Sequence, residues 1–341
     1  ARIMKAIQIQ EFGTLDVLQF VEIDTPTPKA DEVLIKVEAV SVNYSDIIRR
    51  RNETYPFPTQ LPYIPGGEVA GTIEAVGEGV THLSAGMRVF GIVGHGQDGY
   101  AQYATTPAVQ VAPIPDGMSF EIASTLPIAG TTAMLVLSQM ADLQAGETVF
   151  IQGATGGVGS YAIQIARAMG ARKIIGGTSS SGKLDKIMSL GADVAVDYSA
   201  DGWVDRVREA TNGQGVNVIL EMHGGQVFAH GLDCLAPFGR VVVYGMSSRE
   251  PLTLDTDTIE RFFYNPALNQ SLHVFNLGLW LGMHPEKVGQ ALQTLITHTA
   301  QGDIEVNIDT VLPLSCAKDA HHMIETGTSS GKIILHPWEN E

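Results

Sequence analysis

The sequence lacks the features that disulfide-rich, membrane-spanning and nucleic-acid-binding proteins require. Only two of its 341 residues are cysteines, Cys234 and Cys316, and their wide separation argues against a disulfide framework and for a reducing compartment. No apolar run reaches the roughly 18 residues of a membrane span, and the N-terminus lacks the order of a signal peptide. A formal net charge of -16 leaves no basic surplus to neutralise phosphates. We therefore expect a cytoplasmic protein, with no membrane segment and no nucleic acid as its main partner.

The N-terminal part of the chain is rich in short strand-like segments. A proline-rich loop, 55–65, follows a short predicted helix over 44–51. The only local basic run, Arg49-Arg50-Arg51, ends that helix; we interpret it as a solvated helix end, with an anion site as the alternative. These features predict a β-rich, barrel-like domain over residues 1–125. The predicted strands are 5–9, 18–23, 32–43, 66–76, 87–93 and 100–111.

Beyond residue 125 the pattern changes to alternating strands and helices. The strands are continuous apolar runs, which is typical of a parallel sheet covered on both faces. We therefore predict a doubly wound, Rossmann-type α/β domain over residues 126–270. Residues 271–341, with a helix over 285–300, are expected to return to the first domain. The predicted strands are 148–152, 173–177, 194–197, 216–221, 240–244 and 271–275, and the helices between them are 183–190, 203–210 and 226–235.

A glycine cluster separates the first of these apolar strands from the helix that follows it. The spacing G-x-G-x-x-G is met only as Ala154-x-Gly156-x-x-Gly159. Glycine lets a backbone approach phosphates closely, and the opening turn of a helix presents free N–H groups to an anion. The order of strand, glycine turn and helix therefore predicts a dinucleotide site. Its contacts are expected at Ala154, Thr155, Gly156, Gly157, Val158 and Gly159.

The end of the second strand indicates which dinucleotide is bound. An acidic residue there would select NAD through the ribose hydroxyls. Here the strand runs into Thr178, Ser179 and Ser180, with Lys183 following, and no acid precedes Asp185. Hydroxyls and a cation suit the additional phosphate of NADPH, so NADPH is favoured over NADH. The same segment is also an ordinary Ser/Gly loop before a helix, and the two interpretations are compatible.

Several motifs in the same order give the chain a family resemblance. The segments 39–46 (AVSVNYSD), 65–71 (PGGEVAG), 153–159 (GATGGVG) and 330–335 (SGKIIL) resemble those of the medium-chain dehydrogenase/reductase superfamily. Within it, the chain looks most like the zinc-independent NADPH:quinone oxidoreductase branch, which includes zeta-crystallin. The resemblance implies a GroES-like catalytic domain, a Rossmann cofactor domain and a homodimer.

The resemblance also implies particular cofactor contacts. Quinone reductases of this type place a lysine and a tyrosine on the adenosine phosphate, and Lys183 and Tyr198 match them in type and in their spacing of 15. Lys332 is implied either to reach a phosphate or simply to flank the last strand. The remaining contacts carried over by position are His223, Gly245, Met246, Ser247, Phe275, Asn276 and Leu277.

No zinc is expected, because the residue types that bind zinc are absent from the matching positions. Catalytic zinc needs three protein ligands. Where zinc-dependent relatives carry them, this chain has Asn43 and Gly67, and the third position falls near Ile128. Two cysteines cannot supply a four-cysteine structural site either. The histidines at 82, 95, 223, 321 and 322 are scattered or adjacent and are interpreted as surface or satisfied residues.

Without a metal, reduction of an electrophilic quinone or enone by NADPH is favoured over alcohol oxidation. The resemblance implies that Asn43 donates a hydrogen bond beside the nicotinamide and the substrate oxygen, and that Thr132 contacts the nicotinamide. Tyr55 is the candidate for holding or protonating the acceptor, although it is shifted by about one residue from the family tyrosine; its alternative role is packing on proline. The open alternatives are an enoyl-thioester or enone reductase and a non-catalytic NADPH-binding structural protein.

Overall fold

A computed structural model describes residues 2–264 and 268–339 of the chain, which folds into two compact units. Unit 1 comprises residues 1–130 and 308–341, and unit 2 comprises residues 131–307. Residues 1, 265–267, 340 and 341, which fall within the expected domain ranges, lie outside the described residues. The predicted strand 271–275 joins the sheet of unit 2 as its last strand, β13. The rest of the segment up to residue 307 also belongs to unit 2, although residues 271–341 were expected to return to the first domain.

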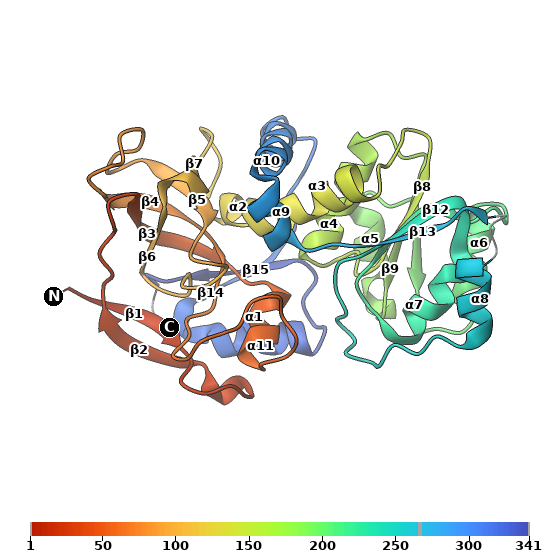
Figure 1. Ribbon diagram of the computed structural model, residues 1–341, viewed down its shortest axis with the longest axis horizontal. Helices are drawn as coiled ribbons and strands as arrows, with labels where there is room; N and C mark the ends of the chain where they lie inside the picture. The colour runs from red at the N-terminus through yellow and green to blue at the C-terminus, as the bar shows by residue number, and fades with distance from the viewer. Residues whose placement is uncertain (1, 265–267, 340–341) are drawn as a thin grey trace. The chain divides into compact units, whose positions relative to one another are not determined.

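Unit 2 is built around a six-stranded sheet in which every pairing is parallel (Figure 1). The strand order is β10-β9-β8-β11-β12-β13. Most residues of β8, β9 and β11 are buried, and apolar residues fill the middle of each strand rather than alternating with polar ones. The predicted doubly wound fold is therefore confirmed. The strands are β8 (Thr148–Ile151), β9 (Lys173–Thr178), β10 (Val194–Asp197), β11 (Val216–Glu221), β12 (Leu235–Val243) and β13 (Ser271–Val274).

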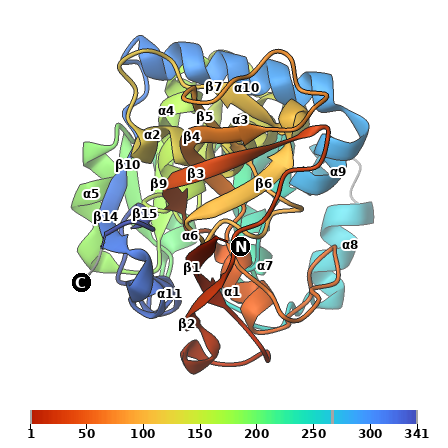
Figure 2. The same ribbon diagram turned by 90° about the vertical axis from the view of Figure 1, so that its left-hand side faces the viewer.

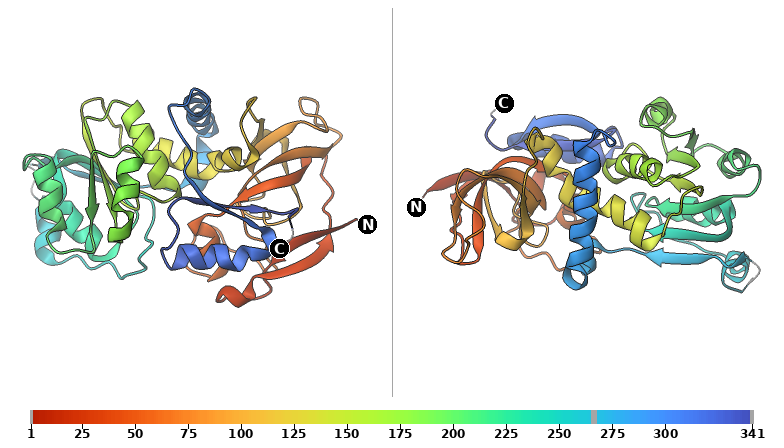
Figure 3. Two further views of the ribbon diagram at one scale, coloured as in Figure 1. Left: turned by 180° about the vertical axis from the view of Figure 1, so that it is seen from behind. Right: turned by 90° about the horizontal axis from the view of Figure 1, so that it is seen from above.

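The helices of unit 2 connect these strands and extend the domain at its C-terminal end. Helix α4 packs on β8 and β9, and α5 packs on β9 and β10. Helix α10 has Pro285 at its first position, where the missing N–H costs nothing, and it crosses α3 (Figure 3). The helices are α3 (Thr131–Leu135), α4 (Gly157–Ala168), α5 (Leu184–Ser189), α6 (Trp203–Ala210), α7 (Gly225–Gly231), α8 (Thr256–Tyr264), α9 (Leu277–Met283) and α10 (Pro285–Ala300).

Unit 1 is organised around the long strand β3, which has three partners (Figure 2). One edge of β3 pairs with β4, and the other pairs with β6 near its start and with β15 near its end. Two register shifts between β3 and β4 mark bulges, which bend a sheet toward a barrel. The strands are β1 (Ile3–Gln8), β2 (Gln19–Asp24), β3 (Glu32–Ser41), β4 (Glu68–Val76), β5 (Arg88–Ile92), β6 (Tyr103–Pro107), β7 (Val111–Pro113), β14 (Ile308–Pro313) and β15 (Lys332–His336).

Three α-helices of unit 1 are α1 (Tyr44–Arg50), α2 (Phe120–Ser124) and α11 (Ala317–Glu325). The basic run at the end of α1 is not solvated as expected, because Arg49 and Arg50 are only 2% and 0% exposed. Arg50 faces α11, where it pairs with Glu325, while Arg51 stays at the surface. Within residues 2–264 and 268–339, no helix is both long enough and apolar enough to cross a membrane.

Candidate functional site

The predicted cofactor contacts of unit 2 gather at one edge of its sheet. The glycine loop follows β8, Thr178 ends β9, Tyr198 follows β10, His223 follows β11, and the segment 245–247 follows β12. Because all these strands are parallel, their carboxyl ends lie at the same edge, where α/β sheets bind ligands. The sequence therefore identified residues that the fold brings together.

The backbone of the glycine loop, residues 153–159, packs so closely that side chains would not fit at two of its glycines. A Cβ on Gly159 would lie 2.1 Å from the carbonyl oxygen of Gly153, so only glycine lets α4 pack this closely against the loop. Gly153 has a φ of 55°, and a Cβ there would meet the sulfur of Met222 at 2.7 Å. Gly156 is the N-cap of α4, so Gly157 and Val158 open the helix, whose first N–H groups lack intrahelical partners. Ala154 and Thr155 are buried beneath this turn.

Tyr198 is tied directly to the glycine loop. Its hydroxyl oxygen accepts a hydrogen bond from the Gly153 N–H at 3.3 Å, and its ring lies 4.9 Å from that of His223. The side chain is buried, and burial raises the pKa of its phenol, so it stays protonated at neutral pH. Tyr198 is therefore held against the glycine loop.

The segment after β9 is the exposed part of this edge. Thr178 is buried and its Oγ1 accepts a hydrogen bond from the Ser180 N–H at 3.1 Å. Ser179 and Ser180 are exposed, and Lys183 is half-buried at the start of α5. Hydroxyls and an ammonium group thus stand where an NAD-selective carboxylate would otherwise lie.

The remaining predicted contacts of unit 2 are positioned mainly by backbone hydrogen bonds. The Ser247 N–H donates to the carbonyl of Met222 at 2.8 Å, and Gly245 packs beside the same residue. The Phe275 N–H donates to the carbonyl of Val243, which extends the β12–β13 ladder. Asn276 caps α9, which begins at Leu277. Met246 is exposed, and Thr132 is buried in α3, which contacts α4.

A buried amide and carboxylate pair beneath this edge was not predicted. Gln152 donates to Glu221 Oε2 from its Nε2, and its Oε1 accepts from the N–H groups of Met222 and His223. Glu221 Oε1 accepts from the N–H groups of His223 and Gly224. Burial raises the Glu221 pKa to about 7. The sequence signal was a polar residue at the end of each of two apolar strands.

In unit 1, the three positions that carry zinc ligands in zinc-dependent relatives do lie together. The Nδ2 of Asn43 donates to Glu68 Oε1 at 3.1 Å, and the N–H of Ile128 donates to Glu68 Oε2 at 2.6 Å. A Cβ on Gly67 would lie 2.8 Å from the Cδ1 of Ile128. An amide, a bare glycine and an alkyl chain do not fit zinc, which takes thiolate, imidazole or carboxylate ligands. Among residues 2–264 and 268–339, no group of three or more His, Cys, Asp and Glu side chains is placed to hold a metal ion.

Lys332 is the first residue of β15, which agrees with the alternative that it flanks the last strand. Its side chain is 3% exposed, and its Nζ donates to the carbonyl oxygen of Val42 and to Oδ1 of Asn43, both at 2.8 Å. The same ammonium group lies 3.1 Å from Glu68 Oε1. Two hydrogen bonds and one ion pair therefore hold the ammonium group within unit 1.

A second series of hydrogen-bonded polar groups, mostly buried, begins at the backbone N–H of Asn43. Asp46 Oδ2 accepts from the backbone N–H of Asn43 at 2.9 Å and from the Tyr100 hydroxyl at 3.2 Å. That hydroxyl also lies 3.0 Å from Nε2 of His321, and Arg50 donates to Nδ1 of the same imidazole at 2.8 Å. Because Arg50 can only donate, Nδ1 accepts, and the neutral ring carries its proton on Nε2.

Burial determines the charge states in this chain of groups. It lowers the pKa of His321 to about 3, with the Arg50 charge adding to the effect, so the imidazole is neutral at pH 7. Burial also raises the pKa of Asp46 to about 6, although four neighbouring groups favour its carboxylate form. The sequence interpretation of His321 as a satisfied residue agrees with its two partners, but the connected series of groups was not predicted.

Tyr55 lies against Arg49 rather than against proline alone. The guanidinium carbon is 5.0 Å from the Tyr55 ring centroid and 4.8 Å from that of Tyr63, and the Tyr55 and Phe57 rings meet edge to face. Arg49 also donates to Thr59 Oγ1 and to Oε1 of Gln97. Burial raises the pKa of the Tyr55 phenol, against the opposing charge and hydrogen bond of Arg49. Tyr55 is thus held as a protonated phenol beside a buried cation.

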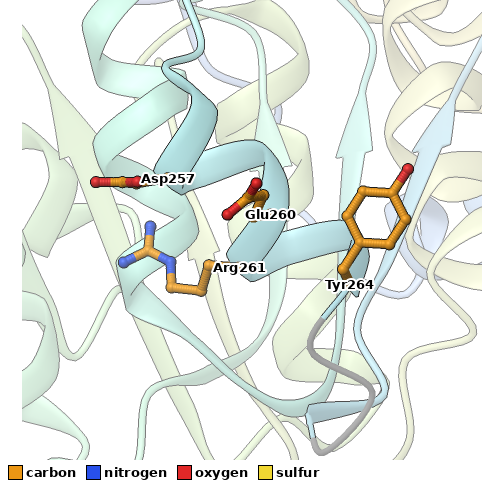
Figure 4. Close-up of a pocket in the computed structure, with 4 residues that line it drawn as sticks. All are labelled: Asp257, Glu260, Arg261 and Tyr264. Carbon is orange, nitrogen blue, oxygen red and sulfur yellow. The ribbon is translucent and has the colours of Figure 1, made fainter.

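Two surface hollows of unit 2 lie outside this candidate site. One, of about 530 Å³, is bounded by Asp257, Glu260, Arg261 and Tyr264 of α8, whose side chains do not converge on one point (Figure 4). The other, of about 760 Å³, is lined by residues near the amino ends of β11 and β12, at the opposite edge of the sheet from the predicted cofactor contacts. Neither hollow collects the predicted functional residues.

Comparison with protein-family models gives one match in each half of the chain. Residues 29–116 match the alcohol dehydrogenase GroES-like domain, and residues 157–297 match the zinc-binding dehydrogenase model. The second name describes that family as a whole, since the three ligand positions in this chain lack zinc-binding side chains.

Among curated proteins, the quinone oxidoreductase of Sus scrofa is 33% identical over 339 residues, which cover 98% of each chain. A phenolphthiocerol/phthiocerol polyketide synthase polypeptide of Mycobacterium tuberculosis is 32% identical over 96% of this chain. The present chain spans only 14% of the length of that synthase polypeptide.

Solved structures show the same similarity. The Escherichia coli quinone oxidoreductase complexed with NADPH superposes with a TM-score of 0.87 at 29% identity, covering 98% of this chain and 100% of the other. The CurK enoyl reductase superposes with a TM-score of 0.85 at 28% identity, covering 98% and 99% of the two chains.

Proposed function

Because the chain belongs to the quinone oxidoreductase family of the medium-chain dehydrogenase/reductases, we propose that it reduces a quinone or a similarly activated carbonyl compound without zinc. It is an NADPH-dependent oxidoreductase. The observation that carries the narrower proposal is the Asn43 amide, held between Glu68 and Lys332 where zinc-dependent relatives carry a metal ligand.

We assign NADPH to the carboxyl edge of the sheet in unit 2. The close contact at Gly159 leaves backbone where a phosphate can approach, and the opening turn of α4 supplies N–H donors. Ser179, Ser180 and Lys183 suit the additional phosphate of NADPH. The solved E. coli relative, complexed with NADPH, supports the same assignment.

When bound, NADPH supplies the hydride. Reduction of a carbonyl-type acceptor places negative charge on its oxygen, and a second step adds a proton. We assign the stabilisation of that oxygen to an N–H of Asn43, since oriented donors aimed at developing charge give large rate effects. Thr132 is assigned to hold the nicotinamide amide. Tyr55 is proposed to hold or protonate the acceptor, because Arg49 can only donate to its oxygen and so leaves its proton for another acceptor.

An acceptor screen monitored by NADPH absorbance tests this function. We expect NADPH to be oxidised at least tenfold faster than NADH with a 1,4-benzoquinone, because Lys183 and the serines pair with the extra phosphate. EDTA in the assay should leave the rate unchanged. A preference for NADH, or loss of activity on chelation, would overturn the proposal.

A second candidate is an enone or enoyl-thioester reductase, which the likeness to the CurK enoyl reductase favours. That reaction protonates carbon and depends more strongly on an acid such as Tyr55. The variant Tyr55→Phe distinguishes the two reactions. If enone turnover is lost while quinone turnover is retained, only the enone reaction needs Tyr55 as an acid. Tyr264→Phe, an exposed tyrosine of α8, is the matched control.

We further propose a cytoplasmic homodimer that forms along β13. This strand is the last of its sheet, and its Val274 and Leu272 side chains are 72% and 38% exposed. Unpaired, apolar edge strands readily pair with another chain. Sedimentation should show a dimer that Val274→Lys converts to a monomer; a monomeric wild-type protein would contradict the proposal.

A further inference from the structure

Three polar side chains from distant parts of the sequence meet in unit 1: the buried Glu68 and Lys332 and the partly exposed Asn43. Glu68 begins β4, Lys332 begins β15, and Asn43 precedes α1. Glu68 is 0% exposed and Lys332 3% exposed, so neither charge is solvated. Burying such a pair is costly unless its geometry is satisfied, and here every contact is one between a donor and an acceptor.

The contacts of Glu68 are all donors. Its Oε1 accepts from Ser41 Oγ at 2.7 Å and from Asn43 Nδ2 at 3.1 Å, and lies 3.1 Å from the Lys332 ammonium. Its Oε2 accepts from the N–H groups of Ile128 and Ala129. A carboxylate that receives donors on both oxygens is fixed in place, and so is the direction from which Asn43 must approach it.

The two charges fix which way the Asn43 amide faces. Its Oδ1 accepts from the Lys332 ammonium at 2.8 Å, while its Nδ2 donates to Glu68. A flipped amide would place its NH₂ group against the ammonium and its oxygen against the carboxylate, so both contacts would become repulsive. One proton of Nδ2 is used by Glu68, and the second remains as a donor on a partly exposed residue.

We propose that Lys332 is a positioning residue, which locks the Asn43 amide so that it offers an N–H, and not its carbonyl, to the oxygen of the acceptor. This inference rests on the proposed carbonyl-reducing function, since an N–H donor is useful only where negative charge develops on oxygen. It also specifies the substrate class: acceptors whose reduction passes through an oxyanion or enolate.

The test is a double-mutant cycle of Asn43→Ala and Lys332→Met, with kcat/KM for a quinone as the readout. We expect each single variant to lose about tenfold to a hundredfold in kcat/KM. Because Lys332 acts through Asn43, adding Lys332→Met to the Asn43→Ala enzyme should cost less than about twofold. Additive losses would overturn the proposal. The exposed lysine of α11, changed as Lys318→Met, is the control.

Two additions keep the result decisive. If Lys332→Met does not fold because Glu68 is left unpaired, the double variant Lys332→Met/Glu68→Gln removes both charges and should show the same loss of kcat/KM. The side-chain amide NMR signals of Asn43, assigned against Asn43→Ala, provide a readout without turnover. They should shift on Lys332→Met, and unchanged signals would refute the role of Lys332 even if the wild-type protein reduced no quinone. If the Asn43 signals change as expected in Lys332→Met but the wild-type protein reduces no quinone, the proposed function is refuted instead.

Discussion

The two units assemble their candidate residues by different physical means. In unit 2 the site is mostly backbone: glycines that admit close approach, helix N–H groups and loops at the ends of parallel strands. In unit 1 it consists of buried charged and polar side chains, with Glu68 and Lys332 in one group and Asp46, Tyr100 and His321 in another. A backbone site depends on local sequence, whereas a buried side-chain network depends on which distant segments meet.

This contrast suits the two proposed ligands, NADPH and the acceptor. The phosphates of a dinucleotide are large anions that backbone N–H groups can bind without any titratable group. An acceptor oxygen that gains charge during the reaction needs a donor of fixed orientation, and buried ionic partners supply that orientation. Substitutions in the two units should therefore separate effects on cofactor binding from effects on the acceptor or on pH-dependent stability.

The largest expected effect is that of Gly159→Ala. Its Cβ would lie 2.1 Å from the Gly153 carbonyl oxygen, so the loop must move away from α4. We expect the Kd for NADPH, measured by calorimetry, to rise by at least about a hundredfold as oriented N–H contacts to the phosphates are lost. Gly289→Ala, where nothing lies within 4 Å, is the control and should bind normally. Unchanged binding by Gly159→Ala would contradict the backbone account of unit 2.

Next in size is the loss of cofactor selectivity in Lys183→Ala. A charge-assisted contact to a phosphate is worth roughly 1.5–3 kcal/mol, so the preference for NADPH over NADH should fall by about tenfold to a hundredfold. The ratio of the two Kd values is the measurement. Lys186→Ala, an exposed lysine of the same helix region, should leave that ratio unchanged. If both variants behave alike, selectivity lies elsewhere along the edge.

An effect that is smaller per pH unit, and that concerns stability rather than binding, is expected for His321→Gln. Because burial depresses the His321 pKa from 6.5 to about 3, its contribution to stability is present above pH 6.5 and is lost as the pH falls through 3. Asp46 acts in the opposite direction between pH 3.8 and about 6, so only the difference between variants isolates the histidine. Between pH 6 and 4, the free energy of unfolding should fall more steeply with acid in the wild type, by about 1.4 kcal/mol per pH unit.

The measurement is backbone amide hydrogen exchange in strand β3, which reports the free energy of unfolding of unit 1 specifically. The adjacent and exposed His322 gives the matched control, His322→Gln, which should retain the wild-type slope. Equal slopes for the wild type and His321→Gln would show that the buried imidazole is not the group that titrates.

The smallest effect is expected at Glu221, the buried acid of unit 2. Its pKa is raised to about 7, so a negative charge forms beneath the cofactor edge as the pH rises from 6 to 8. We expect the Kd for NADPH to rise by about two- to fivefold over that range, because the charge on Glu221 repels the phosphates through a screening medium. Glu221→Gln should remove this part of the pH dependence, whereas Glu209→Gln, away from the cofactor edge at the end of α6, should not. If the pH dependence of NADPH binding persists in Glu221→Gln, another titrating group causes it.

Much of the fold around the candidate cofactor site could be predicted from the sequence. The glycine spacing, the apolar strands and the absence of an acid after β9 are local features, and parallel pairing then places the ends of the strands together. The predicted helix over 285–300 is also observed, since its periodicity and its starting proline are local signals. The strand over 271–275 was predicted as a member of this sheet, and β13 does pair with β12. The extent of unit 2 differed because the segment between this strand and residue 307 also belongs to unit 2, whereas the range 271–341 was expected to return to the first domain.

The acceptor-side residues could be named from the sequence but not connected. Asn43 and Glu68 stood within recognisable segments, yet nothing local indicated that Lys332 reaches both across nearly 300 residues of sequence. The arginines of α1 look solvated in sequence because charged residues usually are; their burial depends on partners as distant as His321 and Glu325.

By itself, then, the sequence determined the class of fold, the glycine loop after β8 and the residue types at the three zinc-ligand positions, because each follows from residue type and short spacing. Tertiary structure alone decided the roles of the buried charges. A buried ammonium, guanidinium or carboxylate is stable only beside particular partners, and which partners meet is settled by the pairing of β3, β4 and β15 and by the packing of α1 on α11.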